Sequence, residues 1–514
     1  MMTSPSPPAA ARPEAVVRGA FWTVASVVVP NLYLVVVSVA AARYLGAAGL
    51  GRQSLIAFAA ASATTIAGAG GFVAVMRAVA TTLDQGDPSA ARAVARWGCR
   101  VHLITGTVAG LAVSAPVVWG AQPRAAWLLA GLVTLLATLQ MVPAAILVGA
   151  RRWREANGVG LLTGALAVPA TVIVLEMGAG IEGLFAVEAA VITVNLGWTG
   201  ELSRRVLRGG GVDDVAAETA ADRRFVEHAR FAAISTIGVT ITVVVWRRSE
   251  LVLLAWLSND VEVARYSVAF AVSALLLTLS DRFAGTMTPA FTRLVVTADR
   301  ERLAAATTRA IRILLICFLP LAAGIAGSGP RAIRVLYGDE FARSGAVLLT
   351  LLIPLAVLPI WSVSAAVLAA HRDAVSPLIA GGAAAALNVA LALALVRSHG
   401  ALGAAVAGAV AQLTAVVLMF GLARRRVPSM TWDFASLARA ALVAAGTGIA
   451  SWSATLWLGG ASGLIIGVLA GAVAMAVLAL WARPLPRADA AWMSDSLGGR
   501  LGVRSAALLA RISR

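Results

Sequence analysis

The 514-residue sequence has no lysine, only 2 cysteines and 4 histidines, and charged side chains at just 13% of its positions. Cys99 and Cys317 lie far apart at no metal-ligand spacing, so neither a disulfide framework nor a zinc site is expected. Long polar stretches are also missing, which leaves no room for a separate soluble catalytic domain. The sequence therefore predicts no metal site and no redox chemistry.

Apolar residues are abundant: hydrophobic residues make up 60% of the chain, and the mean hydropathy is +0.85. Apolar runs of about 20 residues recur between residues 19 and 482, and each is long enough to cross about 30 Å of hydrocarbon as a helix. We count fourteen such runs. They predict an all-α polytopic membrane protein.

All 42 basic residues are arginine, and the formal net charge is +17. The arginines are scattered between the apolar runs instead of clustering on one face, which argues against nucleic-acid binding. If the amino terminus is cytoplasmic, most of them fall in cytoplasmic segments, including Arg424, Arg425, Arg426 and six in the loop 201–230. Short loops that retain Arg orient helices during insertion, so we expect both termini inside.

The two halves of the chain echo each other. Residues 45–58 match 257–270 at an offset of about 212, and residues 180–190 match 400–410 at an offset of 220. The second match pairs Gly180 with Gly400, and nearby Arg152 with Arg372. Spans 1–6 and 7–12 are therefore predicted to be structural repeats, a common construction of secondary transporters, with two extra spans after them.

These patterns divide the chain into six expected parts. The expected parts are a disordered cytoplasmic tail (1–18), an N-terminal six-helix bundle (19–200), a cytoplasmic linker (201–230), a C-terminal six-helix bundle (231–423), helices 13 and 14 (435–482) and a basic cytoplasmic tail (483–514).

Several segments carry a resemblance to a known family. They are Asn31 followed by ARYLGAAGLGRQSL (42–55), Arg77, RRSELVLLAWL (247–257), ARYSVAFAV (264–272), VLYGDEFARSGAVLLTLL (335–352) and ALNVALALALVRSHGALGAAVAGAVAQ (386–412). Together they resemble the oligosaccharide flippases (Wzx or RfbX type) of the MOP superfamily, which also holds the MATE exporters and the lipid II flippases. One departure is Glu250, where many relatives carry Asp.

The resemblance implies a MATE-like fold and a flippase of the bacterial cytoplasmic membrane. Such a protein takes an undecaprenyl-diphosphate-linked glycan at the inner leaflet and releases it at the outer leaflet, for cell-surface polysaccharide biosynthesis. Its expected partners are this substrate, the membrane lipids, and glycan polymerases or glycosyltransferases. It is not expected to be an enzyme or to need a cofactor, and coupling to a proton or sodium gradient stays open.

Charges inside the spans are the candidate functional residues, because each costs about 2.5–3.5 kcal/mol at a helix centre. In the functional interpretation, arginines give the space between the halves a positive potential that attracts a diphosphate through fork-shaped donors. The candidate substrate-binding residues are Arg248, Arg247, Arg282, Arg77, Arg43, Arg52, Asn31 and Glu250. In the alternative interpretation, Arg247 and Glu250 form a structural pair, and the span-end arginines are interface anchors.

Glu188, alone in the middle of span 6, is a candidate coupling site for a proton or a cation. It would equally fit a hydrogen-bonded, inert position between helices, and its repeat-equivalent is Gly408.

Three other functions compete with the oligosaccharide flippase. A lipid II flippase keeps the fold, and so does a MATE-like exporter of small cations, which would want an acidic cavity. A membrane glycosyltransferase or polymerase needs a sizeable outer loop with acidic or histidine residues. The longest outer loop, roughly 329–343, offers only Asp339 and Glu340.

Overall fold

The computed structural model describes most of the chain. The described residues are 13–208, 232–233, 236–238, 240, 243, 245–246, 249–373, 375–457, 460–497 and 510–513, without the side chains of 13–33, 281–286, 289, 492 and 494–497. Residues 13–18 of the expected amino-terminal tail already belong to the first helix, and residues 1–12 lie outside the described part. Most of the expected linker 201–230 and residues 498–509 of the carboxy-terminal tail also lie outside it.

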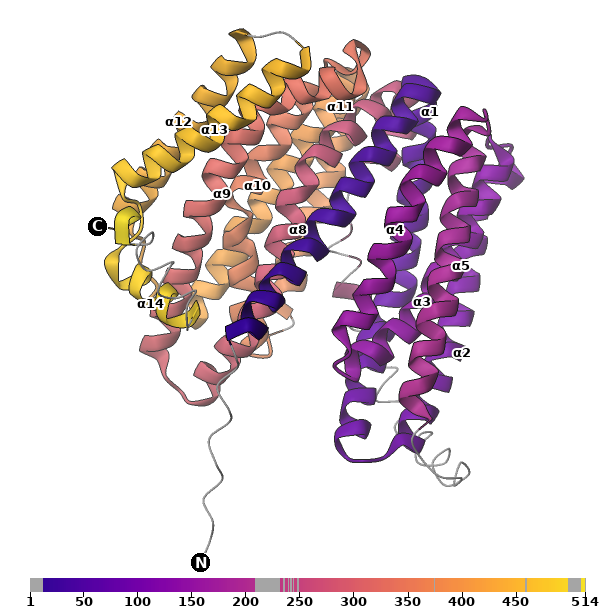
Figure 1. Ribbon diagram of the computed structural model, residues 1–514, viewed down its shortest axis with the longest axis horizontal. Helices are drawn as coiled ribbons and strands as arrows, with labels where there is room; N and C mark the ends of the chain where they lie inside the picture. Colours follow the sequence, from indigo (N-terminus) through magenta and orange to yellow (C-terminus); the bar gives the residue numbers. More distant parts are fainter. Residues whose placement is uncertain are drawn as a thin grey trace, which may run out of the picture.

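Helices make up the described part almost completely (Figure 1), apart from an isolated bridge between Leu485 and Ser513. In chain order the α-helices are α1 (Pro13–Asp84), α2 (Pro88–Ser114), α3 (Arg124–Gly149), α4 (Trp153–Glu176), α5 (Gly180–Leu207), α7 (Glu250–Leu257), α8 (Asp260–Val296), α9 (Arg300–Tyr337), α10 (Ser344–Ala370), α11 (Val375–Arg426), α12 (Phe434–Trp457), α13 (Gly460–Ala482) and α14 (Arg487–Leu497). The short 3₁₀ turns η1 (Ala115–Trp119) and η2 (Asp339–Phe341) follow α2 and α9.

Two of the helices contain two membrane spans each. α1 breaks at Gly46 (φ 67°) and α11 at Gly400 (φ 53°), conformations that glycine adopts without a Cβ penalty. Among the described residues, 11 helices are long and apolar enough to cross a membrane. With the two breaks counted, and with α7 ending a further span, the prediction of about 14 membrane helices is confirmed.

The turns between the spans reveal the repeat, because left-handed backbone recurs at matching places in both halves. The matching positions are Gly86 and Ala298, Gly120 and Gly338, Arg151 and Arg372, and Gly180 and Gly400. The first pair keeps the offset of 212 and the last the offset of 220 that the sequence suggested. The third pair moves the expected partner of Arg372 by one residue, from Arg152 to Arg151. Each repeat therefore has the same series of turns.

The two halves form separate bundles side by side, with α2 to α5 in one and α8 to α11 in the other (Figure 1). Helices α12 and α13 lie outside the second bundle, where α12 packs against α9. Small residues allow this close packing: a Cβ on Gly327 of α9 would meet the carbonyl oxygen of Gly448 at 2.5 Å, and one on Gly467 of α13 would meet Thr455 at 2.3 Å.

The two ends of the molecule differ. At the end that carries the turns at Gly46, Ser258 and Gly400, the ribbons of the two bundles lie close together, and toward the other end they diverge (Figure 1). We call these the joined end and the arginine-rich end, since the arginine-bearing turns around Arg151 and Arg372 are at the latter. Phe58, Leu175 and Leu184 of the first half share a buried apolar cluster with residues of the second half.

Candidate functional site

Arg43 links the two halves at the joined end. Its Nε donates to the carbonyl oxygen of Leu336 at 2.9 Å, and its Nη2 donates to that of Val335 at 2.8 Å. Both carbonyls belong to the last turn of α9, where backbone acceptors have no partner within the helix and the helix dipole favours a cation. The first span of one half thereby caps a helix of the other.

A second link lies at Arg52, six residues after the α1 break at Gly46. The Nε of Arg52 donates to Oδ2 of Asp260, the first residue of α8, at 2.7 Å. Beside this ion pair the two backbones touch: a Cβ built on Gly51 would lie 1.8 Å from the carbonyl oxygen of Asp260. Only glycine fits there, so the close approach is a property of the sequence at position 51.

The second half is braced at the same end by Glu262. This side chain pairs with Arg265 on α8, and its Oε2 accepts a 2.8 Å hydrogen bond from the backbone N–H of Ala401. Ala401 is the first residue after the break in α11, so the carboxylate caps the restarted helix. Sequence reasoning missed Asp260 and Glu262. Both are acidic residues in the first turn of α8, one and three residues after its N-cap, Asn259.

Arg77 lies toward the arginine-rich end of α1, and its side chain is exposed. It is two turns beyond Gly70 on the same helix face. A Cβ on Gly70 would come within 2.2 Å of the carbonyl oxygen of Ala232 and 2.4 Å of Oγ1 of Thr236, both from the segment that precedes α7. Arg77 is therefore on the face of α1 that is turned toward the other half.

Four predicted substrate residues have no described side chain. Arg247 and Arg248 lie outside the described residues. Arg282 is in α8 and Asn31 in α1, and in both the structure describes the backbone only. Their role as substrate ligands stays a prediction.

Glu250 is enclosed within the second half, with 2% of its surface exposed. Its Oε2 accepts from Tyr266 Oη at 3.0 Å, and its Oε1 accepts from Asn388 Nδ2 at 2.8 Å. Gly408 makes room for the carboxylate, because a Cβ there would lie 2.7 Å from Oε1. Buried carboxyl groups need such donors. The cluster ties α7, α8 and both parts of α11 together around the buried carboxylate.

Glu188 of α5 is partly buried and makes no hydrogen bond or ion pair with any residue that the structure describes. Its repeat-equivalent, Gly408, lies directly against the Glu250 carboxylate. Both halves thus have a carboxylate near the equivalent position of their sixth span. In the first half it is Glu188 on that span, and in the second half it is Glu250, which reaches Gly408 from span 7. Within the described part of the chain, no three His, Cys, Asp or Glu side chains gather as a metal site.

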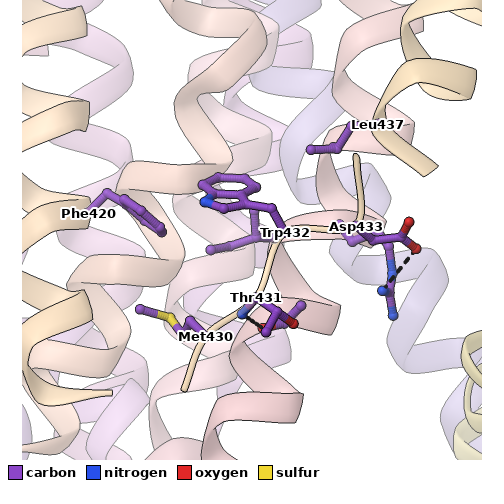
Figure 2. Close-up of a pocket in the computed structure, with 9 residues that line it drawn as sticks. Phe420, Met430, Thr431, Trp432, Asp433 and Leu437 are labelled. Carbon is purple, nitrogen blue, oxygen red and sulfur yellow. Dashed lines mark hydrogen bonds and ion pairs between the residues drawn. The ribbon is translucent and has the colours of Figure 1, made fainter. Parts of the chain in front are cut away.

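A pocket on the second half lies at the arginine-rich end (Figure 2). It is lined by Thr308, Ile311, Arg312, Phe420, Met430, Thr431, Trp432, Asp433 and Leu437. Arg312 pairs with Asp433 at 3.3 Å and with the buried Asp489 of α14, which also accepts from Arg309 at 2.8 Å. The pocket therefore marks the place where α12 and α14 attach to α9. None of the predicted substrate residues contributes to its lining.

Two family models match parts of the chain. A model of a polysaccharide biosynthesis protein matches residues 121–346, and a model of the lipid II flippase MurJ matches residues 279–471. Among solved structures, the lipid II flippase MurJ in an inward closed conformation aligns with a TM-score of 0.66 and 12% identity, covering 90% of this chain and 98% of that one. Parts of the chain are therefore similar to these two families, and its fold is similar to that of MurJ.

Other structures of the superfamily align as well. An inward-facing multidrug resistance MATE transporter gives a TM-score of 0.64 at 16% identity, covering 78% of this chain and 95% of that one. A MOP superfamily transporter from Pyrococcus furiosus gives 0.59 at 18% identity, covering 81% and 96%. At these identities the alignments establish the MOP fold alone. No curated protein sequence matches the chain.

The helical fold and the two partial family matches support a multi-pass membrane protein of the flippase or transporter kind. The structure brings together two bundles, and Arg43 and Arg52 cross between them at the joined end.

Proposed function

We propose that the protein carries a lipid-diphosphate-linked oligosaccharide from the inner to the outer leaflet of a bacterial cell membrane by alternating access, for cell-surface polysaccharide biosynthesis. The observation that carries the proposal is the difference between the two ends. The halves are held together by Arg43, Arg52 and Gly51 at one end, and their helices diverge toward the other (Figure 1). Two bundles joined at one end only can rock against each other.

The arginine-rich end faces the cytoplasm in this proposal, with both termini inside, because short arginine-bearing loops are retained on that side. The joined end then faces the outside, and the two bundles diverge toward the inner leaflet (Figure 1). A lipid-linked substrate enters sideways between the bundles, so its diphosphate passes Arg77.

The cargo follows from charge. Guanidinium groups bind phosphate oxygens through paired donors and stay charged at all physiological pH values, which suits a diphosphate. Arg77 and the predicted Arg248, Arg247 and Arg282 supply this charge. The match of residues 121–346 to a polysaccharide biosynthesis family supports a glycan as the remainder of the cargo.

Two alternatives keep the fold and change the cargo. The match of residues 279–471 to the MurJ model supports lipid II. The similarity to MATE transporters supports a small-molecule exporter, but a cation would be repelled by arginines on the facing surfaces. Glu188 is proposed as the coupling residue under any of them, and Glu188→Gln should then remove the dependence of transport on the ion gradient.

The experiment compares Arg248→Lys, Arg248→Gln and the control Arg425→Gln in a strain that lacks the native gene. If two-pronged phosphate contact is needed, glycan export per folded molecule falls in both Arg248 variants and not in the control. If a general positive field suffices, Lys restores export and Gln does not. Unchanged export with Gln would remove Arg248 from the substrate site. Efflux of cationic dyes without any effect on surface glycan would favour the exporter instead.

A further inference from the structure

The outer face of α2 carries arginines at one end and apolar side chains along the rest. Arg96 and Arg100 are exposed one turn apart, with the exposed thiol of Cys99 beside them. The same helix face continues with exposed apolar residues. They are Leu103 (52% exposed), Ile104 (65%), Val108 (63%) and Leu111 (66%). α2 contains no acidic residue to balance its arginines.

α5 brings a second group of arginines to the same place. Leu207 packs in one buried cluster with Ala91, Val94 and Ala95 of α2, so the end of α5 lies against the start of α2. Arg204, one turn before that contact, is close enough to Cys99 to act on its thiol electrostatically. Further along α5, Trp198 is 46% exposed and Val194 55% exposed. A partly exposed tryptophan is typical of the membrane–water interface.

Within the described part of α2 and α5, positive charge is in excess at this meeting point. Glu201 is the acidic residue of the last two turns of α5, and it is shared: Arg205 donates to it at 3.0 Å, Arg208 lies 3.9 Å away, and Arg204 acts on it electrostatically. Arg100 has no ion-pair partner among the described residues. Among the described residues, several guanidinium groups therefore converge here, and Glu201 is the carboxylate that they share.

We propose that this surface, made of Arg96, Cys99 and Arg100 of α2 with Arg204 and Arg208 of α5, binds the phosphate of an anionic phospholipid in the leaflet at the arginine-rich end. The acyl chains then lie along the exposed apolar stripes of α2 and α5. Charge and depth argue for this occupant: excess arginine at interface level attracts anionic headgroups, and an apolar face begins one turn further into the membrane. The surface lies on the outside of the first half and is separate from the face of α1 that carries Arg77.

The test uses the full chain with Cys317→Ser and a bimane fluorophore on Cys99. It is reconstituted in phosphatidylcholine vesicles that contain brominated phosphatidylglycerol or brominated phosphatidylcholine, and quenching reports which lipid occupies the surface. We expect phosphatidylglycerol to be preferred. Each arginine near a membrane surface contributes about a 5-fold preference, so Arg100→Gln with Arg204→Gln should weaken the preference about 30-fold.

The control removes the same charge elsewhere. Arg424 and Arg425 are exposed at the arginine-rich end of α11, and their double Gln variant should leave quenching at Cys99 unchanged. An equal loss in both double variants, or no lipid preference in the unaltered surface, would overturn the proposal. Relief of quenching by inorganic phosphate would also overturn it, because the surface would then bind a free anion. A second measurement is the melting temperature in detergent. An increase on adding phosphatidylglycerol would support the proposal if the double variant Arg100→Gln with Arg204→Gln does not show that increase.

Discussion

The joined end and the arginine-rich end use the same kinds of interaction in different ways. At the joined end two polar contacts cross from one half to the other: Arg43 with the last carbonyls of α9, and Arg52 with Asp260. At the arginine-rich end, the described ion pairs stay inside one half. Two examples are Arg151 with Asp84 at 3.0 Å in the first half and Arg426 with Asp373 at 2.8 Å in the second.

Contacts within one half and contacts between the halves therefore have different consequences for movement. A pair within one half stiffens that bundle and is kept while the bundle moves. A pair between the halves must break if the joined end is to open. The Arg52–Asp260 pair is well suited to breaking, since its side chains are 51% and 32% exposed and such pairs contribute about 1 kcal/mol or less. The joined end thus combines weak charge contacts with one tight backbone approach.

The largest expected effect comes from a covalent link between the two halves at the joined end. Cysteines at Arg52 and Asp260, in a background of Cys99→Ser and Cys317→Ser, should be bridged by a short bis-methanethiosulfonate reagent, which forms a disulfide with each cysteine. Bridging should abolish transport, because the halves can no longer separate, and reductant should restore it. Glycan export before and after reduction is the measurement.

The matched control bridges cysteines at Asp373 and Arg426, which lie within one half. Transport should survive this bridge. If both bridges block transport equally, the distinction between contacts that cross the halves and contacts within one half is wrong.

A smaller effect is expected from Gly51→Ala. The added Cβ would lie 1.8 Å from the carbonyl oxygen of Asp260, so the helices must separate. Overpacking of this kind costs about 1–3 kcal/mol. Here it destabilises only the state in which the two halves are in contact at the joined end. A cysteine at the buried Leu50 should then react faster with an impermeant maleimide added from outside. Gly158→Ala has open space around it and should change nothing, and equal reactivity in the two variants would show that the approach at Gly51 does not seal this end.

The smallest effect concerns bracing at the arginine-rich end. The backbone N–H of Ser376 and the guanidinium of Arg426 hold the pKa of Asp373 at about 2, below its ordinary 3.8. Because the folded pKa is the lower one, the stabilisation is fully present above about pH 4 and is lost as the pH falls through 2. It amounts to at most about 2.5 kcal/mol. The melting temperature of Asp373→Asn should be lower than that of the unaltered protein at pH 7, and the gap should close below pH 4. A gap that is independent of pH would assign the effect to lost packing.

Membrane character, span number and the repeat could be predicted because they rest on local patterns. Apolar runs of membrane length specify helices whatever they pack against, and Gly180 and Gly400 mark equivalent turns because both have positive φ. The contacts of the candidate site residues could not be predicted in this way. Glu250 was grouped with the substrate arginines on the basis of its depth, whereas its actual neighbours, Tyr266 and Asn388, come from positions 16 and 138 residues away.

The sequence by itself determined that the chain crosses the membrane many times, that its arginines gather at one end, and that it is built from two similar halves, since hydrophobicity, charge and glycine act locally. Only the tertiary structure decided what each charge does. In the sequence, Arg43, Arg52 and Arg77 are alike, since each lies at the end of a span. In the structure, Arg43 faces the end of α9 and Arg52 faces Asp260. Which acceptor faces a guanidinium depends on how distant helices pack, and that packing follows from the contacts of the whole chain.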